Sequence, residues 1–119
     1  MEQNQIEILS PAGSYETFVC AVNCGADAVY IGGQSFNARK NAVNFSNEEI
    51  IKAVEYAHLH FKKVYVTLNT LVSDVELRQV YDFVSFLYDA GVDALIIQDL
   101  AVLNIVKTYF PDFEVHASR

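Results

Sequence analysis

The sequence feature that most constrains the fold is a segment that occurs twice, as Gly-Ala-Asp-Ala-Val-Tyr-Ile-Gly at residues 25–32 and as Gly-Val-Asp-Ala-Leu-Ile-Ile-Gln at residues 91–98. In each copy a glycine, which can adopt a positive φ, is expected to end a helix, and an aspartate follows in the turn. The apolar runs at 28–31 and 94–97 do not alternate with polar residues, so both faces of each strand must be covered. The repeat therefore predicts a parallel sheet flanked by helices.

The length and composition indicate one compact unit. A chain of 119 residues, 52% of them hydrophobic, predicts a single α/β domain over residues 1–119 with a core of its own. The net charge of −7 argues against a free-standing nucleic-acid-binding protein, because phosphate contacts need clustered Lys and Arg and the chain has only eight.

The first five residues are polar and lead directly into an expected strand. The sequence shows neither a basic segment followed by an apolar one at its start nor any apolar run long enough to span a bilayer. We therefore expect a cytoplasmic protein without a membrane segment.

Strands and helices are expected to alternate along the whole chain. Two helix starts are marked by capping boxes at 46–49 and 73–76, and Asp99 is expected to cap a fourth helix that ends before Pro111. His58 and His60 are expected in a solvated C-terminal helical turn. The aromatic residues of the third helix, Tyr81 and Tyr88, are interpreted as core. The expected strands cover 6–9, 28–31, 63–68, 94–97 and 113–116, and the expected helices begin at 15, 47, 74 and 100.

This element order is compatible with a doubly wound open sheet or with part of a (β/α) barrel. No glycine-rich phosphate-binding fingerprint follows any strand, which disfavours the nucleotide-binding open sheet. Polar residues follow every strand instead, as they do at the active-site end of a barrel. A whole barrel needs eight strands and about 250 residues, so the sequence predicts the first half of a TIM-like (β/α) barrel, about four βα units plus a fifth strand.

Six motifs in order then resemble peptidase family U-thirty-two, the collagenase-like peptidase family. They are Leu-Ser-Pro-Ala-Gly-Ser at 9–14, the first repeat with its following glycine at 25–33, Phe-Asn-Ala-Arg at 36–39, Val-Thr-Leu-Asn-Thr at 66–70, Gln-Asp at 98–99 and His-Ala-Ser at 116–118. The resemblance implies an N-terminal TIM-like barrel, a historical peptidase label, and relatives that hydroxylate tRNA or rRNA bases, or ubiquinone precursors, without oxygen. It also implies an iron-sulfur cluster held by cysteines beyond residue 119.

The sequence departs from the family pattern at its end, where Arg119 follows Ser118 and the family usually continues with Thr-Gln. Cys20 and Cys24 occupy helix positions that carry no cluster ligand in the family. We therefore expect no cofactor and no metal site in this chain, with an iron-sulfur cluster only in a full-length family protein. The two cysteines are interpreted as buried, packing side chains, although a thiol pair or half of a metal site is the alternative.

His116 is the candidate catalytic residue, because an imidazole at the end of a barrel strand titrates near neutrality and can act as acid or base; a structural role is the alternative. Arg39 can hold a carboxylate or phosphate with two hydrogen bonds. Ser14 and Thr67 are more simply explained by local hydrogen bonds than as nucleophiles. The candidate substrate-binding residues are Gly13, Gly32, Gly33, Asn37, Arg39, Thr67, Asn69, Thr70, Gln98, Asp99 and Ser118.

Three functions remain open: the N-terminal part of a base-hydroxylating enzyme, part of a peptidase, and an inactive half-barrel that serves as an assembly module. RNA or a peptide would be the substrate only in the full-length protein. Because half a barrel leaves inward-facing side chains uncovered, we expect a homodimer joined through the open side. The side chains expected to face inward are Ile8, Tyr30, Val66 and Ile96.

Overall fold

The computed structural model describes residues 7–32, 45–68 and 77–117. Its strands are β1 (Leu9–Pro11), β2 (Ala28–Gly32), β3 (Lys63–Leu68), β4 (Ala94–Ile97) and β5 (Glu114–Ala117). Its helices are α1 (Tyr15–Asn23), α2 (Asn47–Leu59), α3 (Leu77–Ala90) and α4 (Leu100–Tyr109). The predicted alternation of strands and helices is confirmed, and the bounds of β3 and β4 agree with the sequence prediction residue for residue. The capping box at 73–76 lies outside the described residues.

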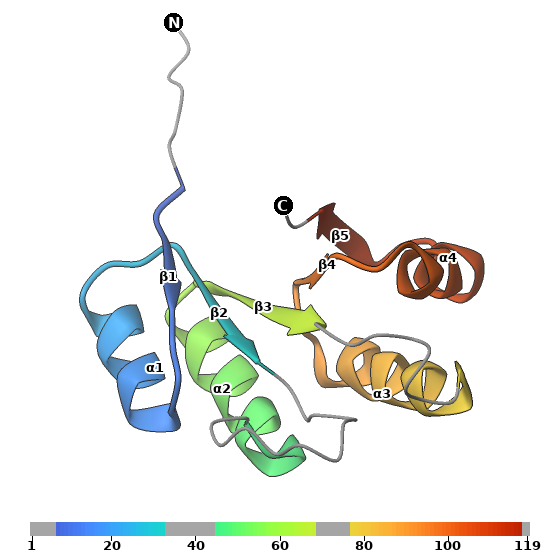
Figure 1. Cartoon of the computed structure of the whole chain (residues 1–119). Coiled ribbons are helices and arrows are strands. Elements are labelled where there is room, and N and C mark those ends of the chain that lie inside the picture. Colours follow the sequence, from blue (N-terminus) through green and yellow to red (C-terminus); the bar gives the residue numbers. More distant parts are fainter. Residues whose placement is uncertain (1–6, 33–44, 69–76, 118–119) are drawn as a thin grey trace, which may run out of the picture.

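The five strands are all parallel and lie side by side in chain order, β1-β2-β3-β4-β5. Consecutive helices contact one another, α1 with α2, α2 with α3 and α3 with α4. Figure 1 shows the helices arranged along one side of the curved sheet. Sequential parallel strands with every helix on one side form part of a (β/α) barrel rather than a doubly wound sheet, so the predicted fold class is confirmed.

The helices begin and end as the sequence chemistry predicts. Ser46 and Glu49 form a reciprocal capping box at α2, and Asp99 caps α4 by accepting hydrogen bonds from Ala101 N–H and Val102 N–H. Gly25 and Gly91, the glycines of the repeat, have φ of 102° and 92°. Residues with a Cβ adopt this backbone conformation only at a cost in steric strain. Of the described helices, none has the length and apolar character needed to cross a membrane.

The main core lies between the sheet and the helices. Its sheet residues alternate along the strands, with Val64 and Val66 on β3 and Leu95 and Ile97 on β4, and each is at most 3% exposed. The expectation that Val66 faces inward is therefore wrong. Val66 lies between Tyr65 and Thr67 in the strand, and adjacent strand side chains point to opposite faces, so Val66 points toward the helices.

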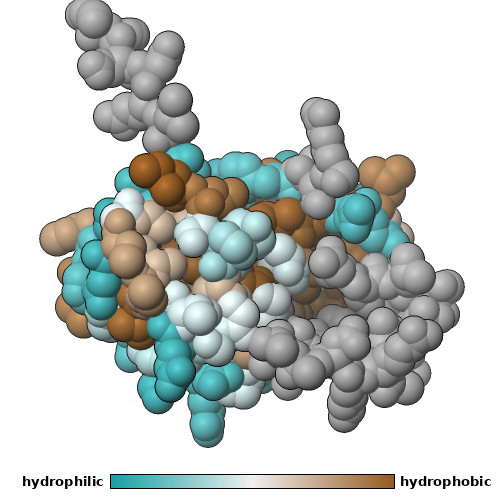
Figure 2. All heavy atoms as spheres, turned by 60° about the vertical axis from the view of Figure 1, so that its left-hand side comes forward, coloured by the Kyte–Doolittle hydropathy of each residue, from teal (hydrophilic) through white to brown (hydrophobic). Residues whose placement is uncertain are grey.

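The first strand lies further along the chain than predicted. It begins at Leu9 and extends through Pro11, and Ile8 precedes it with 57% of its surface exposed. Proline fits here because β1 is an edge strand that, among the described strands, pairs only with β2, so the missing N–H removes no hydrogen bond from the sheet's interior. In Figure 2, hydrophobic atoms are exposed at the upper edge of the molecule, where the described chain begins.

Two further predictions need correction. Tyr81 and Tyr88 of α3 are 36% and 44% exposed instead of belonging to the core, although both rings pack against Phe110. The core side of α3 is formed by Val80, Phe83, Val84 and Leu87. Phe113 is buried but precedes β5 instead of forming part of it.

Candidate functional site

The face of the sheet opposite the helices, here called the inner face, carries a different set of side chains. The strand register aligns Gly32, Thr67, Ile96 and His116 in one row, nearer the carboxyl ends of the strands, and Pro11, Tyr30, Tyr65, Ala94 and Glu114 in the row before it. Only Ala28, Tyr65 and Ala94 form a buried cluster on this face, with Tyr30 and Ile96 partly buried against it. Tyr30 and Ile96 thus lie where the sequence analysis expects them.

Of the candidate site residues, Gly32, Thr67 and His116 lie in the same row of the inner face. Thr67 Oγ1 lies 3.4 Å from the carbonyl oxygen of Ile31, to which it donates a hydrogen bond. Gly13 and Gln98 are exposed in the turns that follow β1 and β4, and Asp99 is the α4 cap. Gly33, Asn37, Arg39, Asn69, Thr70 and Ser118 lie outside the described residues, so their predicted roles stay predictions.

His116 is held on two sides. Its Nε2 lies 2.9 Å from Oε2 of Glu114, which precedes it by two residues on the same face of β5. Its ring stacks on Tyr65, with 5.1 Å between ring centroids and 28° between planes. The side chain remains 44% exposed. In the neutral imidazole, a proton on Nε2 that is donated to the carboxylate leaves Nδ1 as an acceptor. Among the described residues, none hydrogen-bonds to Nδ1 of His116.

Tyr65 connects this pair to the first strand. The Tyr65 hydroxyl donates to the Glu7 carboxylate, with both carboxylate oxygens 3.1 Å away, and the residue is only 4% exposed. Burial, followed by the hydrogen bond and the negative charge of Glu7, raises the pKa of Tyr65 to about 12. Tyr65 therefore stays a neutral donor at every pH near neutrality, and it fixes the plane against which His116 stacks.

Sequence reasoning missed Glu7, Tyr65 and Glu114 as partners of His116. One signal was available, because Glu114 and His116 are two residues apart in a predicted strand and therefore share a face. The Tyr65 contact required the strand order and register, which the sequence does not give residue by residue.

The opposite ends of the strands carry a separate polar system. Asp27 and Asp93, the aspartates of the repeat, each accept a hydrogen bond from the backbone at the start of a neighbouring strand: Oδ2 of Asp27 from Ile8 N–H, and Oδ2 of Asp93 from Val64 N–H, both at 2.8 Å. Oδ2 of Asp93 also lies 2.8 Å from Nε2 of His58. His58 is exposed as expected, but its contact with Asp93 was not foreseen. At the amino ends of barrel strands such groups serve stability.

The interpretation of the two cysteines as buried is wrong. Both are exposed, Cys20 in α1 and Cys24 at its C-cap, with 3.9 Å between their sulfur atoms. An iron-sulfur cluster needs about four thiolates, and among the described residues no group of three or more His, Cys, Asp or Glu side chains converges on one point. The described part of the chain therefore does not offer a ligand set for a cluster.

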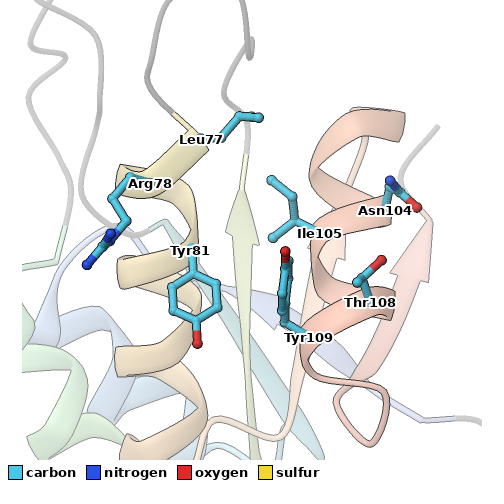
Figure 3. A pocket seen from close by; sticks show the side chains of 7 residues that line it. All are labelled: Leu77, Arg78, Tyr81, Asn104, Ile105, Thr108 and Tyr109. Carbon is cyan, nitrogen blue, oxygen red and sulfur yellow. The ribbon is translucent and has the colours of Figure 1, made fainter.

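A groove of about 500 Å³ lies between α3 and α4 on the helical side. Figure 3 shows Tyr81 and Tyr109 facing each other across it, with ring centroids 5.3 Å apart. Arg78, also on its wall, is paired with Asp82 at 3.3 Å. The groove is on the opposite side of the sheet from His116 and contributes nothing to the inner face.

Comparison with known proteins gives a consistent family assignment. The family model described as Peptidase family U32 matches residues 13–119. The chain is 43% identical over 118 residues to the 23S rRNA 5-hydroxycytidine C2501 synthase of Escherichia coli and 40% identical over 112 residues to tRNA hydroxylation protein P1 of Bacillus subtilis. It is 34% identical over 119 residues to a protein named collagenase from Porphyromonas gingivalis.

These matches cover 99%, 94% and 99% of the chain but only 18%, 26% and 28% of the respective relatives. Among solved structures, the U32 peptidase Mk0906 superposes with a TM-score of 0.72 at 13% identity, over 99% of this chain and 51% of that one. Citrate synthase SbnG superposes with a TM-score of 0.57 at 17% identity, over 90% and 40%. Both structural similarities support the fold alone, and the chain matches 51% of the first protein and 40% of the second.

Proposed function

Because the chain belongs to peptidase family U32, we propose that it supplies the first half of a (β/α) barrel that hydroxylates an RNA base, and that His116 acts at that site. The inner face would form one wall of the site, and the base would enter from the carboxyl ends of the strands.

The names of the more similar relatives support RNA as the substrate. The two relatives with identities of 43% and 40% are named for hydroxylation of rRNA and tRNA, whereas the relative named collagenase is 34% identical. Proteins that act on tRNA or rRNA meet their substrate in the cytoplasm, and we propose that location for this protein. With a net charge of −7, the chain would depend on other parts of the full-length protein to bind the RNA backbone.

The observation that carries the proposal is the setting of the His116 ring. Tyr65 supports one side of the ring and Glu114 accepts from Nε2, while the exposed part of the ring faces the open side of the sheet. A nucleobase can stack on such a ring, and Nδ1 can then exchange a proton with it. Tyr65 and Glu114 together hold the ring in one orientation.

Peptide hydrolysis has less support from the geometry. A hydrolase of the serine or cysteine type needs a nucleophile within hydrogen-bond reach of its base. Among the described residues, no Ser, Thr or Cys side chain is hydrogen-bonded to His116. Peptide hydrolysis is therefore less well supported than RNA hydroxylation.

Nucleoside mass spectrometry tests the proposal directly. Total tRNA and rRNA would be digested from cells that carry the gene, from cells in which it is deleted, and from deletion cells that express the full-length protein with His116→Ala. Deletion should remove a hydroxylated nucleoside, and H116A should fail to restore it. His60→Ala is a matched control, since His60 is an exposed histidine at the end of α2 whose Nδ1 contacts only the Tyr56 carbonyl among the described side-chain hydrogen bonds, and it should restore the nucleoside fully.

An unchanged nucleoside profile after deletion would contradict the RNA proposal. Cleavage of gelatin by the full-length protein, lost in H116A but not in H60A, would establish the peptidase function in its place.

Assembly is a second candidate function, favoured by the partly exposed side chains Tyr30 and Ile96 of the inner face and by the two edge strands β1 and β5. We propose that two copies of the 119-residue chain pair through the inner face, since one patch serves both partners of a two-fold dimer. Sedimentation equilibrium at micromolar concentration should give twice the 13.3 kDa chain mass. A well-folded species of 13.3 kDa at all concentrations would contradict the dimer.

A further inference from the structure

Cys20, in the last turns of α1, and Cys24, the C-cap of that helix, form an exposed pair away from the inner face. Residues four apart on a helix lie on the same side, one turn above the other, and the two sulfur atoms are 3.9 Å apart. Both residues are exposed and reduced. Neither side chain belongs to either core cluster, so packing does not explain the pair.

The separation of the sulfur atoms fits a bridging ion better than a disulfide. With metal–sulfur bonds of about 2.3 Å, sulfur atoms 3.9 Å apart subtend an angle of about 116° at the ion. That angle lies between tetrahedral and trigonal geometry, so an ion can bind without movement of the helix. A disulfide requires about 2.05 Å between the sulfur atoms, and the two side chains would have to approach by nearly half of their present separation.

We propose that Cys20 and Cys24 form a two-thiolate site for a soft divalent cation such as Zn²⁺ or Cd²⁺, with solvent completing the coordination. Thiolates are the ligands that such cations prefer. The site is independent of the proposed RNA chemistry, because it lies on the helical side of the sheet and shares no residue with the inner face.

The local charge on the helix favours a cation. Glu16 precedes Cys20 by one turn on the same side of α1, and α1 contains no basic residue. Binding converts two thiols and one divalent cation into a dithiolate complex and two protons, so charge and atoms balance. The hydrogen bond that the Cys24 thiol makes with Cys20, followed by the charge of Cys20, raises the pKa of Cys24, so the ion must displace a proton from this sulfur.

Titration of the 119-residue chain with Cd²⁺ under reducing conditions, followed by the ultraviolet absorption of cadmium–thiolate bonds, tests the site. The chain contains only these two cysteines, so any such absorption arises from this pair. We expect a saturable band. Cys20→Ser and Cys24→Ser should each weaken Cd²⁺ binding by more than the roughly 10–100-fold that the loss of an outer-sphere partner costs.

Circular dichroism of each variant provides the folding control, and exposed side chains are expected to tolerate serine. Glu16→Gln is a matched control that retains both thiols and should retain the band. Absence of a band in the wild-type chain, or a band of equal affinity in C20S, would overturn the proposal. So would the recovery of a Cys20–Cys24 disulfide as the only product of cation treatment.

Discussion

The two faces of the same sheet differ sharply in what covers them. On the helical face Val64, Val66 and Leu95 are completely buried against the helices. On the inner face, the neighbouring residues Tyr65 and Ile96 belong to a small cluster. There the Tyr65 hydroxyl donates to Glu7, and Glu114 pairs with His116. Both faces are built from alternate residues of the same strands, so each strand supports the fold with one set of side chains and presents a second set for interaction.

The two ends of the strands also differ in how their polar groups are used. At the amino ends, the Oδ2 atoms of Asp27 and Asp93 accept hydrogen bonds from backbone N–H groups at the start of neighbouring strands. Near the carboxyl ends, His116 retains an unengaged nitrogen among the described contacts and an exposed ring edge. The helical face and the amino ends therefore carry stability, and the inner face near the carboxyl ends is available for binding.

The largest expected effect is a difference in stability loss between substitutions of two adjacent residues of β4. Leu95→Ala should lower the free energy of unfolding by about 2–5 kcal/mol, because it leaves a cavity in the completely buried main core. Ile96→Ala removes a partly exposed side chain on the inner face and should cost about 1 kcal/mol in the monomer. Urea unfolding of both variants measures the difference, and equal losses would show that the two faces are equally buried.

The repeat aspartates should show a smaller difference at the amino ends. Asp93→Ala leaves Val64 N–H without its carboxylate acceptor and removes the partner of His58. We expect a loss of about 1–3 kcal/mol, since an unsatisfied donor costs that much. Asp27→Ala loses the bond to Ile8 N–H near the edge of the sheet, together with a 4.0 Å contact to Lys62, and should cost less.

Thermal unfolding of both aspartate variants compares their losses of stability. A larger loss in D27A than in D93A would mean that the edge strand β1 contributes more to stability than its single neighbour indicates.

The smallest expected effect concerns the inner face and depends on pH. Tyr65→Phe removes the hydroxyl that donates to Glu7 and should cost about 0.5–1.5 kcal/mol at neutral pH. The pKa of Tyr65 is about 12 in the folded chain and ordinarily about 10. A raised folded-state pKa stabilises the fold below the unfolded value, and that contribution is lost as the pH rises from about 10 through 12.

In urea titrations, the difference in free energy of unfolding between the wild-type chain and Y65F should therefore shrink as the pH rises from about 10 through 12. Glu7→Gln should reduce the pH dependence, because the carboxylate contributes to the shift. A constant difference between wild type and Y65F from pH 9 to 12 would contradict the Tyr65–Glu7 contact.

Much of the fold follows from local chemistry. The glycine-aspartate repeat predicts two helix ends and the strands that follow them, and the capping box at Ser46 fixes the start of α2. The polar residues after the strands and the length of the chain predict half a barrel, which the chain-order sheet confirms. These signals operate over a few residues, or over the order of elements, and neither depends on knowing the packing in detail.

The predictions that were wrong depended on information absent from local sequence. The apolar residues of β3 do not reveal which alternate set faces the helices, so Val66 was assigned to the wrong side. The cysteines of α1 lie beside the apolar stripe of Phe18 and Val22, and their exposure depends on the exact direction from which α2 packs. The Tyr65–His116 contact joins residues that only the strand register brings together.

The most direct test of the open inner face is the rate at which a thiol reagent labels single cysteines placed on β4. In a chain with Cys20→Ser and Cys24→Ser, Ile96→Cys and Leu95→Cys would be compared at increasing protein concentration. The account predicts rapid labelling of I96C in dilute solution, slower labelling as copies pair through the inner face, and slow labelling of L95C throughout. Equally slow labelling of both cysteines in dilute solution would contradict it, because the inner face would then be covered within a single chain.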